Sequence, residues 1–190
     1  MQIDKKDKFI YKKSIVVQIK FIIMAIFNTL YNFLPFFCFK KLVLSIMRIK
    51  IGKKSYIHSA KFFAFGKMEI GNNSTINRGC YLDNRGRIYV GNNVNIAHDT
   101  KIYTQGHDID SPNFESKGAD VIIEDYACIF SNVLIMPGVR IGKGAVVYPG
   151  SVITKNVGNY EVVGGNPAKY IKKRNENLVY ELNYDYWFAL

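Results

Sequence analysis

The chain has 190 residues, enough for one packed domain or for one domain with an extension, and 48% of them are apolar. Residues 1–61 hold 13 Lys/Arg and 2 Asp/Glu, whereas residues 62–190 hold 13 of each, so the formal charge of +11 lies entirely in the N-terminal third. A nucleic-acid-binding domain spreads basic residues over a folded face, so this distribution argues against nucleic acid as a partner. Three scattered cysteines without a CxxC pair argue against a disulfide framework and favour a reduced cytoplasmic setting.

The first expected element is a basic, apolar helical extension over residues 1–50. No residue from Phe21 to Phe39 is charged, and this length is enough for a membrane-spanning helix to be considered. Pro35 predicts a break, with a second short helix near Phe36–Met47. The polar side chains form roughly one helical stripe, as in an amphipathic helix: Ser14, Gln18, Asn28 and Asn32. Three interpretations stay open: the extension lies on the inner face of a membrane, packs on the protein's own body, or spans the bilayer.

From residue 51 to residue 165 aliphatic residues recur every six positions. The clearest run is Ile123, Ile129, Ile135, Ile141, Val147 and Ile153. A period of six fits neither an α-helix nor an alternating strand. It is typical of a parallel β-helix, in which each hexapeptide forms one flat side and three sides make a coil of about 18 residues. We therefore predict an all-β solenoid of roughly six coils, with the aliphatic residues pointing inward and stacking from coil to coil.

The repeat fails once. After Ile102 the next aliphatic positions include Asp108 and Asp120, and the pattern resumes at Ile123, three residues late. A stacked solenoid gains nothing from such an interruption, and loops on rigid scaffolds often have functional roles. The phase break therefore predicts one extruded loop over residues 107–120, with His107 at its base.

Three stretches add a family resemblance to this pattern: "INRGCYLDNRGRIYVGNN" at 76–93, "TQGH" at 104–107 and "VVGGNPAKYIKKR" at 162–174. Over about residues 51–175 the chain resembles the hexapeptide-repeat acyltransferases, which have a left-handed β-helix fold. It is similar to the maltose and galactoside O-acetyltransferases, and the first stretch looks closer to acetyltransferases of bacterial capsule, O-antigen and exopolysaccharide pathways. The resemblance implies a homotrimer that binds acetyl-CoA between neighbouring β-helices, without a metal. The N-terminal helix-and-acid module of the sugar acetyltransferases is absent here.

The resemblance also implies site residues. His107 matches the catalytic histidine, a general base that takes the proton of the acceptor hydroxyl as it attacks the thioester directly in a ternary complex. Asn77, thirty residues earlier, matches the asparagine that contacts the acceptor. Cys128 departs from the tryptophan that is usual at its position. The residues that match the family's acetyl-CoA contacts are Ser131, Thr154, Lys155, Lys169 and Lys172.

Three further residues are candidates for acceptor binding, each with a structural alternative. Asp83 and Asn84 lie at a two-residue offset in the earlier part of the repeat, where they bind the acceptor or form a corner. Asp108 in the loop holds the acceptor, orients His107 or only solvates the loop. A metal bound by the three histidines, as in the γ-class carbonic anhydrases, is not expected, because His98 and His107 are nine apart where those enzymes place two ligands five apart.

Together these features predict an O-acetyltransferase that acts on a sugar hydroxyl in surface polysaccharide biosynthesis, either on the polymer or on its lipid-linked precursor. Two other functions stay open, namely N-acetylation of an amino sugar and a non-catalytic trimeric scaffold associated with a membrane. The expected location is the cytoplasm, with peripheral contact of residues 1–47 at the inner membrane face. Residues 166–190 are expected to form a C-terminal tail.

Overall fold

The computed structural model describes residues 5–188, with side chains from residue 15 onward. Two helices, α1 (Lys5–Phe33) and α2 (Phe37–Ile46), precede the strands and are separated at Pro35, as the sequence predicts. The strands are β1 (Lys50–Ile51), β2 (Tyr56–Ile57), β3 (Ala60–Phe62), β4 (Met68–Ile70), β5 (Thr75–Ile76), β6 (Cys80–Leu82), β7 (Ile88–Val90), β8 (Asn95–Ile96), β9 (Lys101–Ile102), β10 (Gln105–His107), β11 (Ser116–Gly118), β12 (Val121–Ile123), β13 (Cys128–Ile129), β14 (Leu134–Ile135), β15 (Arg140–Ile141), β16 (Val146–Val147), β17 (Val152–Ile153), β18 (Glu161–Gly164) and β19 (Lys169–Lys173).

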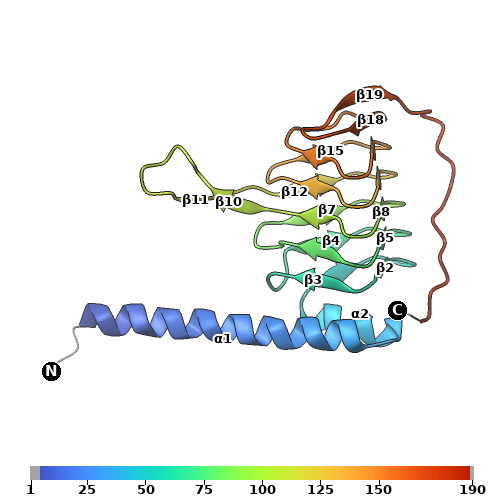
Figure 1. Cartoon of the computed structure of the whole chain (residues 1–190). Helices are drawn as coiled ribbons and strands as arrows, with labels where there is room; N and C mark the ends of the chain where they lie inside the picture. The colour runs from blue at the N-terminus through green and yellow to red at the C-terminus, as the bar shows by residue number, and fades with distance from the viewer. Residues whose placement is uncertain (1–4, 189–190) are drawn as a thin grey trace.

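These short strands stack into three parallel sheets that form the sides of a β-helix (Figure 1). One sheet has the order β1-β4-β7-β12-β15, the second β2-β5-β8-β13-β16-β18 followed by the antiparallel β19, and the third β3-β6-β9-β14-β17. Strand β12 pairs in register with β7 although the extruded loop separates them in sequence. The predicted fold class, a β-helix of hexapeptide repeats with a helical extension and one loop, is confirmed.

The repeat fills the interior with one stacked aliphatic core. Ile123, Ile129, Ile135 and Ile141 are fully buried, and so are the small residues four positions later, such as Ala127 and Val133. Each coil alone has too little apolar surface to fold, so its stability comes from burying these side chains against the coils above and below. The inward positions predicted from the period of six are therefore the observed core.

Helix α1 closes the lower end of the stack, where β3 would otherwise leave an unpaired edge. Asn28 accepts a hydrogen bond from the N–H of Phe62 (2.8 Å) and donates one to its carbonyl (2.9 Å). Asn32, one turn later, makes the same pair of bonds with Ala60, at 2.9 and 3.0 Å. The side chains of α1 thus replace a neighbouring strand, which explains why two asparagines occur in an apolar helix.

The C-terminal tail runs back along the whole stack to α2 (Figure 1). The N–H of Leu182 donates to the side-chain oxygen of Asn93 (3.2 Å), and the N–H of Phe37 donates to the carbonyl of Trp187 (3.2 Å). Phe188 forms an antiparallel bridge with Phe36. The tail therefore connects the last coil to the helices at the first.

Candidate active site

The extruded loop is an antiparallel hairpin made by β10 and β11, which projects from one corner of the stack (Figure 1). His107 is the last residue of β10 and pairs with Ser116. Across the hairpin, Asp108 donates its N–H to the carbonyl of Glu115 at 2.8 Å. His107 is therefore displayed on a two-stranded arm rather than on an unstructured loop.

The ring of His107 is held by Phe114, which lies in the loop that connects β10 to β11. Its Nδ1 lies 2.8 Å from the carbonyl oxygen of Phe114, and its ring stacks on that of Phe114 with centroids 4.3 Å apart and an interplanar angle of 5°. A carbonyl can only accept a hydrogen bond, so this contact assigns the proton of the neutral imidazole to Nδ1. Nε2 then keeps its lone pair on an exposed side chain, which is the state that a general base requires.

Sequence reasoning missed Phe114, because its contact with His107 depends on the register of the hairpin. Phe114 adopts a left-handed backbone conformation with φ of 48°, which is uncommon for a bulky residue. No repeat position or motif indicates this role, since the loop lies outside the period of six. The carbonyl of Phe114 orients the imidazole, so Phe114 acts on the site through its backbone.

Asp108 is used within the hairpin. Its carboxylate pairs with Lys117 at 3.0 Å and accepts the N–H of Asp110 at 3.2 Å. The hydrogen bond from Lys117, followed by the backbone bond, lowers the pKa of Asp108 below its ordinary value. These contacts stiffen the arm that displays His107, a role that the sequence does not predict, while the contact of Asp108 with an acceptor stays a prediction.

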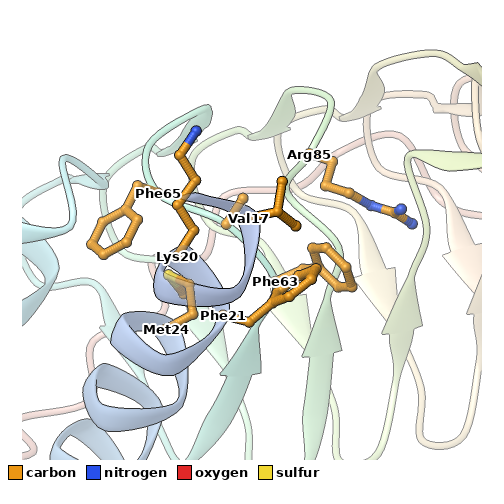
Figure 2. A pocket seen from close by; sticks show the side chains of 8 residues that line it. Val17, Lys20, Phe21, Met24, Phe63, Phe65 and Arg85 are labelled. Atoms are coloured by element: carbon orange, nitrogen blue, oxygen red, sulfur yellow. The ribbon is translucent and has the colours of Figure 1, made fainter. Parts of the chain in front are cut away.

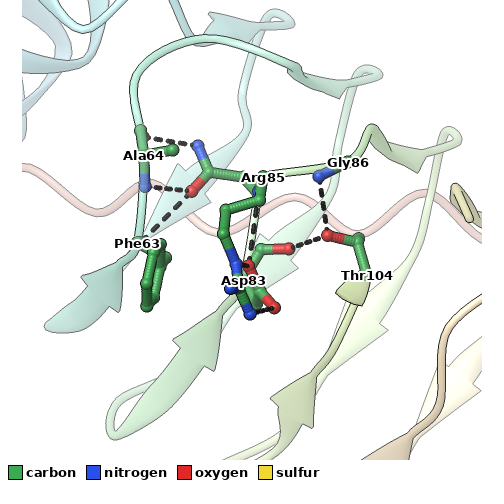
Figure 3. A network of polar contacts seen from close by, with 7 residues as sticks. Phe63, Ala64, Asp83, Arg85, Gly86 and Thr104 are labelled. Atoms are coloured by element: carbon green, nitrogen blue, oxygen red, sulfur yellow. Dashed lines mark hydrogen bonds and ion pairs between the residues drawn. The ribbon is translucent and has the colours of Figure 1, made fainter. Parts of the chain in front are cut away.

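Asp83 lies at a corner beside Thr104, near the base of this arm (Figure 3), and Asn84 follows it in the chain. Both are fully buried. Asp83 binds the guanidinium of Arg85 through both of its carboxylate oxygens, each at 2.8 Å. Asn84 accepts the N–H groups of Phe63 and Ala64 and donates to the carbonyls of Ala64 and Gly66, which uses its amide completely. This geometry favours the corner role over direct acceptor binding.

Asn77 and Ser131 lie at a different corner of the coil from His107. They follow β5 and β13 in the second sheet, whereas Asp83, the hairpin and Thr154 follow strands of the third sheet. Asn77 donates to the side-chain oxygen of Asn95 (3.2 Å) and to the carbonyl of Ile96 (3.0 Å). One chain therefore presents the predicted site residues as two separate columns, with the third sheet between them.

A groove near the upper end of the second sheet has the composition that acetyl-CoA needs. It has a volume of about 360 Å³. Its lining includes Cys128, Phe130, Val146, Tyr148, Lys172 and Arg174. An apolar floor suits the pantetheine arm, and the cations suit the phosphates. Burial raises the pKa of the Cys128 thiol, so Cys128 contributes bulk to this groove rather than a thiolate.

Three of the other predicted acetyl-CoA contacts, Thr154, Lys155 and Lys169, are exposed and lie outside this groove. Thr154 and Lys155 follow β17 in the third sheet, and Lys169 begins β19. Ser131 follows the groove residue Phe130 directly. Of the predicted set, the structure brings Lys172 into the groove and Ser131 to its edge, and it leaves the other three at separate positions of the same chain.

The remaining histidines are placed apart from this site. His58 is buried against Phe37 and Tyr186, and its pKa is lowered to about 4 by desolvation and then by the positive charges of Arg78, Lys40 and His98. His98 is exposed. In the described part of the chain, no three His, Cys, Asp or Glu side chains gather closely enough to hold a metal ion.

Comparison with known proteins places this geometry in a family. Residues 120–155 match the family described as bacterial transferase hexapeptide (six repeats). The chain is 30% identical over 141 residues to a galactoside O-acetyltransferase of Lactococcus lactis subsp. lactis, an alignment that covers 71% of this chain and 68% of that protein. It is 42% identical over 73 residues to a chloramphenicol acetyltransferase of Klebsiella aerogenes, covering 37% of this chain and 35% of the relative. The chain thus spans between about a third and two thirds of the length of these relatives.

A solved structure shares the fold over most of the chain. It is a hexapeptide-repeat acetyltransferase of Vibrio cholerae O1 biovar eltor in complex with acetyl-CoA, with 26% identity and a TM-score of 0.74, covering 80% of this chain and 86% of that one. The stacked repeat, the extruded hairpin with its histidine, and the similarity along two thirds of a galactoside O-acetyltransferase show that the chain belongs to the hexapeptide-repeat acetyltransferase family.

Proposed function

We propose that the chain transfers the acetyl group of acetyl-CoA to a sugar hydroxyl, with His107 as the general base. The observation that supports this most is the contact between Nδ1 of His107 and the carbonyl of Phe114, which leaves Nε2 free to accept a proton. As the acceptor oxygen bonds to the thioester carbon, Nε2 takes its proton. When the carbon–sulfur bond breaks, the imidazolium returns that proton to the CoA thiolate, so transfer occurs directly in a ternary complex.

The acetyl donor and the trimer belong to the same proposal. The V. cholerae structure contains acetyl-CoA, and the groove beside Lys172 offers apolar and cationic groups for such a donor. His107 and Asn77 occupy different corners of one chain, so a site that contains both is best formed between two copies. A homotrimer in which neighbouring chains face each other supplies that arrangement.

The lower end of the molecule supports a location at a membrane surface. The segment Ile15–Phe33 is long and apolar enough to cross a bilayer, and only 11% of it is buried. Its last turns are docked on β3, so it cannot cross a bilayer without losing those bonds, and we propose that it lies flat on the surface. Exposed aromatic rings extend the same apolar base from α1 to α2 and the tail: Phe33, Phe36, Phe39 and Trp187.

A protein placed there meets surface-polysaccharide precursors while they are attached to lipid. We therefore propose that the acceptor is a saccharide of a surface polysaccharide or its lipid-linked precursor, acetylated on the inner face of the membrane. The name of the Lactococcus relative supports a sugar hydroxyl as the acceptor.

Substitution of His107 tests the reaction. His107→Ala removes the base from an exposed position, so the fold should persist and acetyl transfer from acetyl-CoA should fall by at least about 100-fold. Transfer is measured as release of free CoA thiol with galactosides and oligosaccharides as acceptors. Ile109→Ala, an exposed change in the same loop, is the matched control and should keep its activity. Turnover of the folded His107→Ala protein at the wild-type rate would remove His107 from the mechanism, whereas no transfer by the wild-type protein to any of these acceptors would favour a non-catalytic scaffold.

A further inference from the structure

A cavity of about 380 Å³ lies between α1 and two corners of the β-helix (Figure 2). Its apolar walls come from Val17, Phe21, Met24, Phe63 and Phe65. Its polar lining consists of two cations, Lys20 and Arg85, and among the side chains that the structure describes no acidic one lines it. The volume falls within the range of small-molecule sites. An apolar cavity with positive charge suits an amphiphile that has a hydrocarbon chain and an anionic head.

The walls on the β-helix side are held rigidly. Asn84 fixes the turn that contains Phe63 and Ala64 through four hydrogen bonds to its backbone. The guanidinium of Arg85 lies 4.2 Å above the ring of Phe63, and Phe21 meets the same ring edge-on with centroids 6.0 Å apart. The cavity is therefore preformed, which lowers the entropy that a ligand loses on binding.

The charge at this cavity is not balanced. Asp83 pairs with Nε and Nη2 of Arg85, so that carboxylate offsets the guanidinium. Over the described residues, Lys20 has no carboxylate within ion-pair distance, and Nη1 of Arg85 donates no hydrogen bond. One net positive charge and a free N–H donor thus remain for an anion such as a phosphate.

The cavity also lies between the proposed membrane face and the β10–β11 hairpin, which displays His107. Val17 and Phe21 are 38% and 48% exposed on α1, so a chain that enters the cavity continues along the apolar side of that helix. On the other side, Thr104 donates to the carbonyl of Asp83 at 2.5 Å and accepts the N–H of Gly86 at 2.8 Å. His107 follows Thr104 by three residues, a span of about 10 Å in extended chain.

We propose that this cavity binds the first part of the chain and the phosphate of a long-chain isoprenoid alcohol phosphate, the lipid end of a lipid-linked saccharide acceptor. The hydrocarbon lies against the aromatic walls, the phosphate lies at Lys20 and Arg85, and the attached sugar extends along the corner toward the hairpin. The inference rests on the proposed function for the identity of the sugar acceptor, but binding of the lipid end is a separate property of the cavity.

The test measures binding of farnesyl phosphate, below its micelle concentration, to the full chain by calorimetry. Farnesyl phosphate should bind at least about 10-fold more tightly than farnesol or inorganic phosphate, because each lacks one half of the recognised chemistry. Lys20→Glu should weaken binding by at least about 10-fold through charge reversal at the phosphate, and Ala64→Trp should abolish binding by filling the cavity. Lys143→Glu, the same charge change on an exposed lysine of another coil, should bind like the wild type.

Equal binding by Lys20→Glu and Lys143→Glu would overturn the assignment of the phosphate. Binding of oleoyl lysophosphatidic acid as tightly as farnesyl phosphate would assign the cavity to phospholipid and overturn the lipid-carrier proposal. His107→Ala should bind farnesyl phosphate like the wild type, since His107 does not line the cavity. In the wild-type protein, binding of farnesyl phosphate without acetyl transfer to any sugar acceptor would refute the proposed function alone. Acetyl transfer that depends on His107, without binding of farnesyl phosphate, would refute this inference alone.

Discussion

The asparagines of α1 give a sharp test of whether this helix is part of the folded domain. Asn28→Leu keeps the size and helical preference of the side chain but leaves the N–H and carbonyl of Phe62 without their partners, at 2.8 and 2.9 Å. An unsatisfied buried backbone group costs about 1–3 kcal/mol. Because the site is only partly buried and water can reach it, we take the low end of this cost, about 1 kcal/mol, for each of the two groups. The expected loss in the free energy of unfolding is therefore about 2 kcal/mol.

The measurement is urea unfolding followed by circular dichroism, with all variants at one protein concentration, because subunit association also contributes to stability. With a denaturant slope of 1–3 kcal/mol/M, a loss of about 2 kcal/mol lowers the midpoint by roughly 1 M. Thr29→Ala, on the exposed side of the same helix, is the control and should stay within about 0.5 kcal/mol of the wild type. Asn28→Leu at wild-type stability would mean that α1 is not docked on β3.

Three further predictions concern the other parts of the molecule. The pKa of His58 is lowered to about 4 in the folded state, so the unfolded chain binds more protons between pH 6.5 and 4, and the free energy of unfolding decreases as the pH is lowered through this window. His58→Leu should reduce this decrease, measured by urea unfolding at several pH values. An unchanged dependence of the unfolding free energy on pH would assign the decrease to other groups. Lys172→Glu should raise the KM for acetyl-CoA far more than that for the acceptor, with Lys143→Glu as the control, and unchanged acetyl-CoA kinetics would place the donor outside the groove. Full-length protein should co-sediment with anionic vesicles at low salt and dissociate from them as the salt concentration rises. The double substitution Ile22→Asp and Ile26→Asp should weaken this binding, whereas the control Val179→Asp, on the exposed tail, should not. Wild-type protein that stays in the supernatant at low salt would refute the membrane proposal.

The repeat could be predicted from sequence because each inward position repeats one local rule. Ile129 and Ile135 obey the same steric requirement, so the period exposes the core, and a failure of phase exposes the hairpin. The role of Asn84 could not be predicted in this way. Its four hydrogen bonds go to a turn about twenty residues away in the preceding coil, and their geometry depends on how two irregular corners meet.

The extension shows the same limit. Its helical character and the break at Pro35 follow from local preferences, and the stripe with Asn28 and Asn32 is visible in the sequence. What that stripe contacts depends on the free edge of β3, which only the folded stack creates. The tail has no periodicity at all, and the contact of Leu182 with Asn93 joins residues that no local pattern relates.

The returning tail makes this solenoid differ from a simple linear repeat array. A simple repeat protein behaves as a linear array, in which each unit interacts only with its neighbours and the ends can fray independently. Here the tail connects the two ends of the stack. The N–H of Phe37 donates to the carbonyl of Trp187, and Phe36 forms a bridge with Phe188, so the last coil is linked to the helices at the first coil. During synthesis the first coils emerge before Trp187 and Phe188 exist, so the packing of α2 is completed only after the tail has been made.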